Sequence, residues 1–152
     1  IGVLGTAATI VQPYVDRLAH QFAADCAVVR FGSAELVDLA EAKLRGERTD
    51  LADHKRILDG LLSQRGGERI DTVVLACTHF PLLREELEAA APRPLAFVDG
   101  NEGIARRTAW LSRDIAWPGS PGDGVAIFTG KADYEPYRRA FADYGLLRMD
   151  RL

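Results

Sequence analysis

The residue types most able to do chemistry stand together at the end of an apolar run, in the segment Val73–Leu83. The run Val-Val-Leu-Ala is followed by Cys77, Thr78 and His79 and then by Phe-Pro-Leu-Leu, which predicts a buried strand, three functional side chains and a helix start. In open α/β sheets ligands bind beyond the carboxyl ends of the strands, where Cys77 should lie. A helix N-terminus beside it favours the thiolate, which could act as a base or a nucleophile. His79 could exchange a proton with it or orient a substrate. The alternative is a buried core cysteine followed by a capping threonine and a packed histidine.

A second polar segment, which runs from Gly5 to Thr9, follows the first predicted strand. It contains Thr6 and Thr9, and two hydroxyls with free amides at a helix N-terminus could hold a carboxylate or a phosphate. The segment lacks the lysine of a Walker loop and the glycine pattern of a dinucleotide-binding turn. On its own, Thr9 is interpreted first as a helix N-cap, with anion binding as the alternative.

No residue pattern in the sequence indicates a metal site or an organic cofactor. Asp50, Asp53 and His54 fall on one helix face, but no second cluster supports them, and a solvated polar face is the better interpretation. A Schiff base with pyridoxal phosphate would need a lysine in a suggestive setting. None of the lysines has one; they are Lys43, Lys55 and Lys131. We therefore expect neither a metal nor a cofactor.

Short apolar runs alternate with helix-period segments, which is typical of βα units and a parallel sheet. The predicted strands are Gly2–Gly5, Cys26–Phe31, Thr72–Ala76, Leu95–Val98 and Val125–Thr129. The predicted helices are Thr9–Ala24, one from Ser33 to about Leu44, one from Asp50 to Gly66, a short one between Pro81 and Pro92, Ile104–Leu111, and one from about Asp133 to Tyr144. The fold class is therefore α/β, with a three-layer α/β/α lobe around a mostly parallel sheet.

The composition limits the partners that we expect. Hydrophobic residues make up 47% of the 152 residues and the net charge is −3, which argues against a basic nucleic-acid surface. No apolar run approaches the roughly 20 residues that span a bilayer, and no signal segment opens the sequence. Two cysteines, Cys26 and Cys77, are too few for a disulfide framework. We expect a cytoplasmic protein with a small-molecule substrate and with neither a nucleic-acid nor a membrane partner.

The motif Ala76–Leu83 resembles the second cysteine motif of glutamate racemases, within the aspartate/glutamate racemase superfamily. The segment Ile1–Thr9 resembles the strand of that family that ends in Gly-Thr-x-x-Thr. Weaker similarities follow in the family's order, at Ser33–Glu41, Phe97–Ala105 and Phe128–Gly130. The resemblance therefore runs through the whole chain, and the Cys-Thr-His-Phe-Pro-Leu-Leu string is its most specific part.

The resemblance implies a cofactor-independent enzyme with two α/β lobes and an active site between them. Such enzymes interconvert L- and D-glutamate and supply D-glutamate for peptidoglycan. One thiolate removes the α-proton and a second thiol delivers a proton to the opposite face. By this resemblance Cys77 is one acid/base group, and His79 and Glu41 complete the catalytic candidates. The expected substrate contacts are Thr78, Thr6 and Thr9. A homodimer of the full-length protein is a further expectation.

One departure from the family pattern is large. The first-cysteine motif of the family, Ala-Cys-Asn-Thr, and its Asp-Ser-Gly motif are absent, and Cys26 has no Asn-Thr after it. The sequence also opens in a strand-like segment without an initiator Met. We therefore expect the C-terminal part of an enzyme whose first half is missing, inactive by itself. Residues 1–95 would form the second lobe, and residues 96–152 would belong to the first.

Three other functions stay open at this stage. An aspartate racemase and a single-cysteine decarboxylase belong to the same superfamily, and the decarboxylase would account for the single catalytic cysteine. A small-molecule binding domain that keeps the fold without turnover is the alternative from another class. The sequence upstream of Ile1 separates these functions, because a racemase requires the two missing motifs there.

Overall fold

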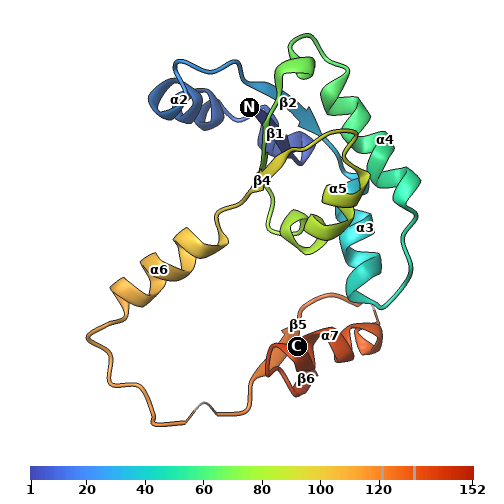
Figure 1. Cartoon of the computed structure of the whole chain (residues 1–152). Coiled ribbons are helices and arrows are strands. Elements are labelled where there is room, and N and C mark those ends of the chain that lie inside the picture. The colour runs from blue at the N-terminus through green and yellow to red at the C-terminus, as the bar shows by residue number, and fades with distance from the viewer. Residues whose placement is uncertain (121, 132) are drawn as a thin grey trace.

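A four-stranded parallel sheet forms the centre of the protein. The computed structural model (Figure 1) describes residues 1–120, 122–131 and 133–152. The strand order is β2-β1-β3-β4, formed by β1 (Gly2–Gly5), β2 (Val29–Gly32), β3 (Thr72–Leu75) and β4 (Ala96–Val98). All three pairings are parallel, and β1 and β3 are neighbours. The predicted α/β fold with a mostly parallel sheet is confirmed.

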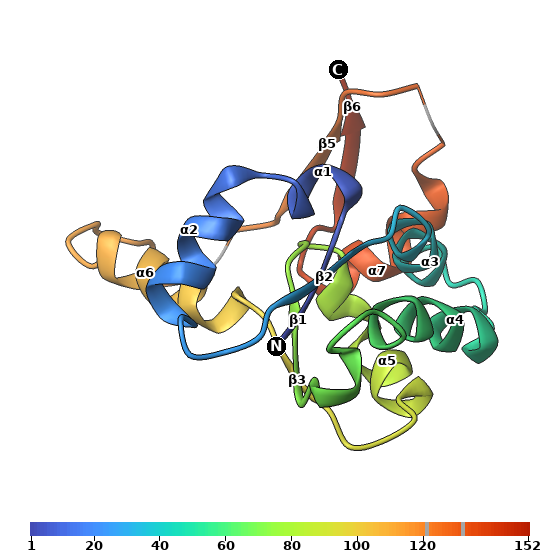
Figure 2. The same ribbon diagram turned by 90° about the horizontal axis from the view of Figure 1, so that it is seen from above.

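Helices cover the two faces of the sheet unequally. One face carries α3 (Glu35–Leu44), α4 (Leu51–Leu62) and α5 (Arg84–Ala90), which follow one another around the sheet in Figure 2. The short helices η1 (Gly67–Arg69) and η2 (Phe80–Leu83) precede β3 and α5. The other face carries α1 (Ala7–Ile10) and α2 (Pro13–Phe22). The result is the expected order of helix, sheet and helix.

The core lies between the sheet and the helices α3, α4 and α5. In the strands the side chains alternate, because successive residues point to opposite faces. Leu4 and Val73 therefore point into this core, whereas Val3 and Val74 line a pocket on the other face. The helices add fully buried leucines to this core, namely Leu36 from α3, Leu58 and Leu61 from α4, and Leu87 from α5. Each buried leucine contributes about 1.5–3 kcal/mol of transfer free energy.

Three local predictions near the N-terminus were wrong. The single helix predicted over Thr9–Ala24 is two helices, because α2 begins at Pro13, which has no N–H to continue α1. The N-cap of α1 is Thr6 and not Thr9, because the Thr6 hydroxyl accepts from the Thr9 backbone N–H at 3.2 Å. Cys26 does not lie in a strand. The strand begins three residues later, at Val29, which pairs with Gly2 of β1.

The predicted start signals of α3 and α4 match the structure more closely. The Ser33 hydroxyl accepts from the backbone N–H of Leu36 at 3.1 Å, and Asp50 caps α4 by accepting from the backbone N–H of Ala52 at 2.9 Å. The chain leaves α4 through Gly66, whose φ of 90° lies in the left-handed region that glycine adopts without strain.

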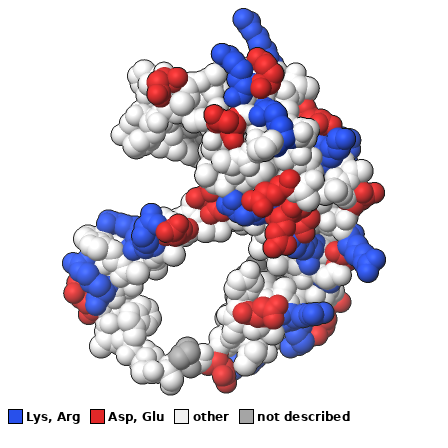
Figure 3. Space-filling model, in the orientation of Figure 1, with Lys and Arg blue, Asp and Glu red and all other residues white. Residues whose placement is uncertain are grey.

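The sheet continues past residue 95 through β4, and the chain then leaves the lobe along α6 (Asn101–Leu111). This helix has no buried residue and points away from the sheet in Figure 1. Acidic and basic side chains are intermixed over the face shown in Figure 3. Among the described helices, none combines the length and the apolar character that a bilayer crossing would require.

The final segment forms a small unit that we call the C-terminal module, residues 125–152 without residue 132. It contains β5 (Val125–Phe128), η3 (Glu135–Tyr137), α7 (Arg138–Asp143) and β6 (Arg148–Arg151), with β5 and β6 parallel. The sequence did not predict β6, because Arg-Met-Asp-Arg is polar and only Met149 is buried. Both views place α7 beside α3 (Figures 1 and 2).

Candidate active site

Cys77 lies at the carboxyl edge of the sheet, as the sequence predicts. The backbone N–H of Ala76 donates to the Leu4 carbonyl at 2.8 Å, which carries the parallel ladder to the last residue before the cysteine. The adjacent strand β1 ends one residue before Thr6. The polar segments that follow β1 and β3 therefore begin side by side at the edge where parallel sheets bind ligands.

A tight turn holds Cys77 and His79 together. The backbone N–H of Phe80 donates to the Cys77 carbonyl at 3.2 Å, and the Phe80 and Leu83 side chains are fully buried. Lys43 of α3 donates to the Leu82 carbonyl at 2.8 Å, which ties η2 to α3. These anchors place Nδ1 of His79 3.8 Å from the Cys77 sulfur.

Glu41 of α3 selects the tautomer of His79. Its Oε1 lies 3.0 Å from Nε2 of His79, and a carboxylate oxygen can only accept a hydrogen bond. In the neutral imidazole the proton therefore sits on Nε2, and the Nδ1 lone pair faces the Cys77 thiol. This arrangement lets His79 take the thiol proton and leave a thiolate, while the Glu41 carboxylate stabilises the imidazolium that results.

A residue that the sequence analysis missed completes this arrangement. The hydroxyl of Tyr137, in η3, donates to Oε2 of Glu41 at 2.7 Å and accepts from Arg45 at 3.2 Å. The pKa of Glu41 is held below its usual range, first by the hydrogen bond from Tyr137 and then by that from His79. Glu41 therefore stays ionised when His79 needs it as an acceptor. No local signal points to Tyr137, which lies 96 residues from Glu41.

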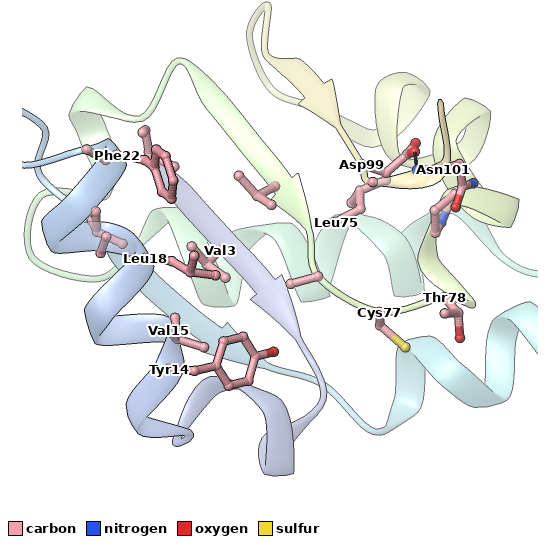
Figure 4. A pocket seen from close by; sticks show the side chains of 18 of the residues that line it. Val3, Tyr14, Val15, Leu18, Phe22, Leu75, Cys77, Thr78, Asp99 and Asn101 are labelled. Atoms are coloured by element: carbon pink, nitrogen blue, oxygen red, sulfur yellow. Dashed lines mark hydrogen bonds between the residues drawn. The ribbon is translucent and has the colours of Figure 1, made fainter. Parts of the chain in front are cut away.

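Cys77 and Thr78 also line a pocket of about 700 Å³ on the α2 face of the sheet. In Figure 4 they lie at one end of this pocket, together with Asp99 and Asn101, and the Phe22 side chain lies at the other. The remainder is lined by apolar side chains of the sheet and α2, namely Val3, Val15, Leu18, Phe22 and Leu75.

Asp99 is fixed at the rim of the polar end. The Arg84 guanidinium binds its Oδ2 at 2.7 Å, and the backbone N–H of Asn101 donates to its Oδ1 at 2.8 Å. Both interactions lower the pKa of Asp99, with the larger contribution from the Asn101 amide. Because its oxygens are engaged in this way, Asp99 acts as the anchor of the turn into α6.

Thr6 and Thr9 lie at the neighbouring strand end but do not line the pocket. Their hydroxyls are 2.9 Å apart and hydrogen bond to each other. The structure therefore brings Cys77, Thr78 and His79 into one turn and leaves the threonine pair beside them, partly exposed.

The prediction that Asp50, Asp53 and His54 form a solvated polar face was wrong for the histidine. His54 is fully buried and its Nδ1 lies 2.9 Å from the Asp50 carbonyl, whereas its Nε2 has no hydrogen-bond partner among the residues that the structure describes. Asp53 instead pairs with Arg56 at 2.9 Å.

Over residues 1–120, 122–131 and 133–152 no group of three or more His, Cys, Asp or Glu side chains could hold a metal ion. Cys26, the other cysteine, is exposed and lines no part of the pocket beside Cys77.

Fold and site together define a class: an α/β lobe that presents a cysteine–histidine pair at the end of a parallel strand. The sequence model of the Asp/Glu/Hydantoin racemase family matches residues 1–108. The chain belongs to the Asp/Glu/Hydantoin racemase family.

Two individual proteins of known name are similar to this chain in sequence. The glutamate racemase of Sphingopyxis alaskensis is 51% identical over 147 residues, which cover 96% of this chain and 55% of that protein. The glutamate racemase of Pectobacterium carotovorum is 50% identical over 118 residues, 78% of this chain and 41% of that protein. The chain therefore spans about half the length of these curated relatives.

Solved structures agree with the sequence relatives. Escherichia coli glutamate racemase, in complex with L-glutamate and the activator UDP-MurNAc-ala, aligns with a TM-score of 0.87 and 41% identity. The alignment covers 99% of this chain and 57% of that protein. Glutamate racemase RacE1 of Bacillus anthracis aligns with a TM-score of 0.70 at 19% identity, which supports the fold alone.

Proposed function

We propose that the chain is part of a cofactor-independent glutamate racemase and that Cys77 is one of its two proton-transferring groups. The observation that carries this proposal is the position of the Cys77 thiol. It lies at a strand end of a racemase fold, 3.8 Å from a histidine whose other nitrogen is bound by a carboxylate. The roles of His79 and Glu41 as acid/base partners rest on the same contacts.

Racemisation of an amino acid requires few groups besides Cys77, His79 and Glu41. The α-proton of an amino acid is weakly acidic, so its removal requires a base near the α-carbon and hydrogen bonds to the carboxylate. The Cys77 thiolate would take the proton on one face, and a second thiol, contributed by another lobe, would return a proton on the other. The substrate carboxylates would be held by Thr78, Thr6 and Thr9.

The same proposal assigns the two parts of the chain to two different lobes of the whole protein. The boundary expected at residue 95 moves to residue 98, because β4 (Ala96–Val98) pairs with β3 in the sheet that carries Cys77. Residues 1–98 would belong to the lobe that carries Cys77, and residues 99–152 would belong to the lobe that carries the other thiol. The exposed α6, which leaves the sheet after β4, supports a crossing between lobes in this region. In the whole protein, a cytoplasmic location, a role in supplying D-glutamate for peptidoglycan and a homodimer belong to the same proposal.

The relatives favour glutamate over the other substrates considered. Two racemases about half identical to this chain are named for glutamate, and the Escherichia coli protein is described in complex with L-glutamate. A single-cysteine decarboxylase would not need the second acid/base group and would release carbon dioxide. Product analysis therefore distinguishes the two reactions.

The test uses the full-length protein, with L-glutamate in deuterated water. Racemisation predicts D-glutamate and α-deuteration without added metal or pyridoxal phosphate. Replacing Cys77 by Ala should lower kcat by about 10²–10⁴-fold, because one of two acid/base groups is lost. The matched control is Cys26→Ala, which removes the exposed cysteine and should leave kcat unchanged. Full activity of the Cys77→Ala protein would refute the proposal.

A further inference from the structure

The side chains behind Cys77 form a continuous hydrogen-bonded series that reaches the C-terminal module. From the sulfur it passes through His79 to Glu41, and from Glu41 to Tyr137 and Arg45. The first three residues belong to the sheet lobe, whereas Tyr137 belongs to η3 of the C-terminal module. We propose that Tyr137 is a positioning residue, by which the C-terminal module holds Glu41 in the orientation that aligns His79 with the Cys77 thiol.

The two oxygens of the Glu41 carboxylate serve two different partners. Oε1 accepts from His79 at 3.0 Å and Oε2 accepts from Tyr137 at 2.7 Å. A glutamate at the end of a flexible side chain has several rotamers available, and one hydrogen bond leaves the carboxylate free to rotate about it. A second bond from a different direction removes that freedom, so the carboxylate plane is set by both partners.

Arg45 determines the direction of the Tyr137 hydroxyl. Its guanidinium donates to the phenol oxygen at 3.2 Å and is itself held by Glu47 at 2.6 Å. Because the guanidinium has only donors, the phenol proton must point elsewhere, toward Glu41. The groups that face Glu41 are therefore His79 from the turn before η2, Tyr137 from η3 and Arg45, the residue that follows α3.

The ring of Tyr137 is fixed independently of its hydroxyl. It lies 6.1 Å from the Phe141 ring and 6.5 Å from the Phe128 ring. Phe128 in turn stacks on Tyr134 at 5.0 Å. The module is thus built around aromatic packing that does not need the Tyr137 oxygen, and the phenol is presented to α3 from a rigid support.

The inference rests on the proposed function, but its test does not require racemase activity. In the 152-residue chain, the Tyr137→Phe variant keeps the ring and loses the hydroxyl. The matched control is Tyr134→Phe, which removes a hydroxyl from the same aromatic cluster. Two readouts apply: titration of the Glu41 carboxyl carbon by NMR, and the rate of Cys77 alkylation by iodoacetamide at pH 7.

We expect the Tyr137→Phe variant to titrate Glu41 at higher pH than the parent protein does, because the main cause of its lowered pKa is gone. Cys77 alkylation should slow by about tenfold, which corresponds to about 1.4 kcal/mol of activation free energy. The Tyr134→Phe variant should show neither change. A purely structural role for Tyr137 would lower the unfolding midpoint and leave the Glu41 titration unmoved, and that result overturns the proposal, as does equal behaviour of the two variants.

In full-length protein, the same substitution should lower kcat by about tenfold with KM within twofold of the parent value, since Tyr137 does not touch the substrate pocket. A parent protein that does not racemise glutamate refutes the proposed function, and the NMR and alkylation results still decide the positioning role.

Discussion

Phe80 is the residue whose loss should most directly release the Cys77 turn. Its side chain has no exposed surface and belongs to the central cluster, and its backbone N–H closes the turn onto the Cys77 carbonyl. Replacing Phe80 by Ala removes the ring and leaves a cavity under η2. For a fully buried phenylalanine the cost is about 3–5 kcal/mol. Since domains of this size are stable by about 5–15 kcal/mol, the substitution should remove about a fifth or more of the total.

The assay is urea unfolding of the 152-residue chain followed by circular dichroism, with Phe22→Ala as the matched control. Phe22 is the same residue type but is 74% exposed, so its removal should change the free energy of unfolding by no more than about 0.5 kcal/mol. The slope of the transition should stay constant, so that midpoints report stability. A loss below about 1 kcal/mol for Phe80→Ala, or equal losses for both variants, would show that this turn is not anchored by the core.

Two further predictions concern acid and the isolated chain. Glu41 and Asp99 have lowered pKa values, so the stability that their carboxylates contribute is present above their ordinary values of 4.5 and 3.8 and is lost as pH falls through the folded pKa values. The free energy of unfolding should therefore decrease below about pH 4.5, and less steeply in a Glu41→Gln variant; a stability that rises in acid contradicts this. The 152-residue chain alone, which has one thiol at the site, should form no D-glutamate from L-glutamate in deuterated water. An enzyme-like rate of D-glutamate formation there, measured by NMR, would mean that a second acid/base group exists within the chain.

Local patterns were enough to predict the sheet and the position of Cys77. The apolar runs at Gly2–Gly5 and Thr72–Leu75 are short, bounded by turn residues and separated by helix-period segments, and each of these features is readable within a few residues. The same holds for the caps at Ser33 and Asp50, since a capping side chain binds an amide two or three residues ahead. The cysteine follows its strand directly, so the edge on which it lies follows from the direction of the strand.

Features that depend on a partner could not be predicted in this way. Cys26 falls outside β2, which begins at Val29, and His54 is buried because the packed helices enclose its face of α4. The short strand β6 exists because β5 pairs with it; its own residues are mostly polar. In each case the local pattern allowed two outcomes, and a contact with a distant segment selected one.

The candidate site shows most clearly the difference between features set by the local sequence and features set by contacts with distant segments. The sequence by itself determined that a cysteine and a histidine two residues apart stand at the end of a buried strand, because their spacing and surroundings are local. The family resemblance named Glu41 as a candidate, but only the tertiary structure showed that it binds His79 and that the Tyr137 hydroxyl holds it, because Glu41 and Tyr137 lie 38 and 96 residues from their partners. Contacts over such separations depend on how whole elements pack, since α3 must lie against η2 on one side and against the C-terminal module on the other.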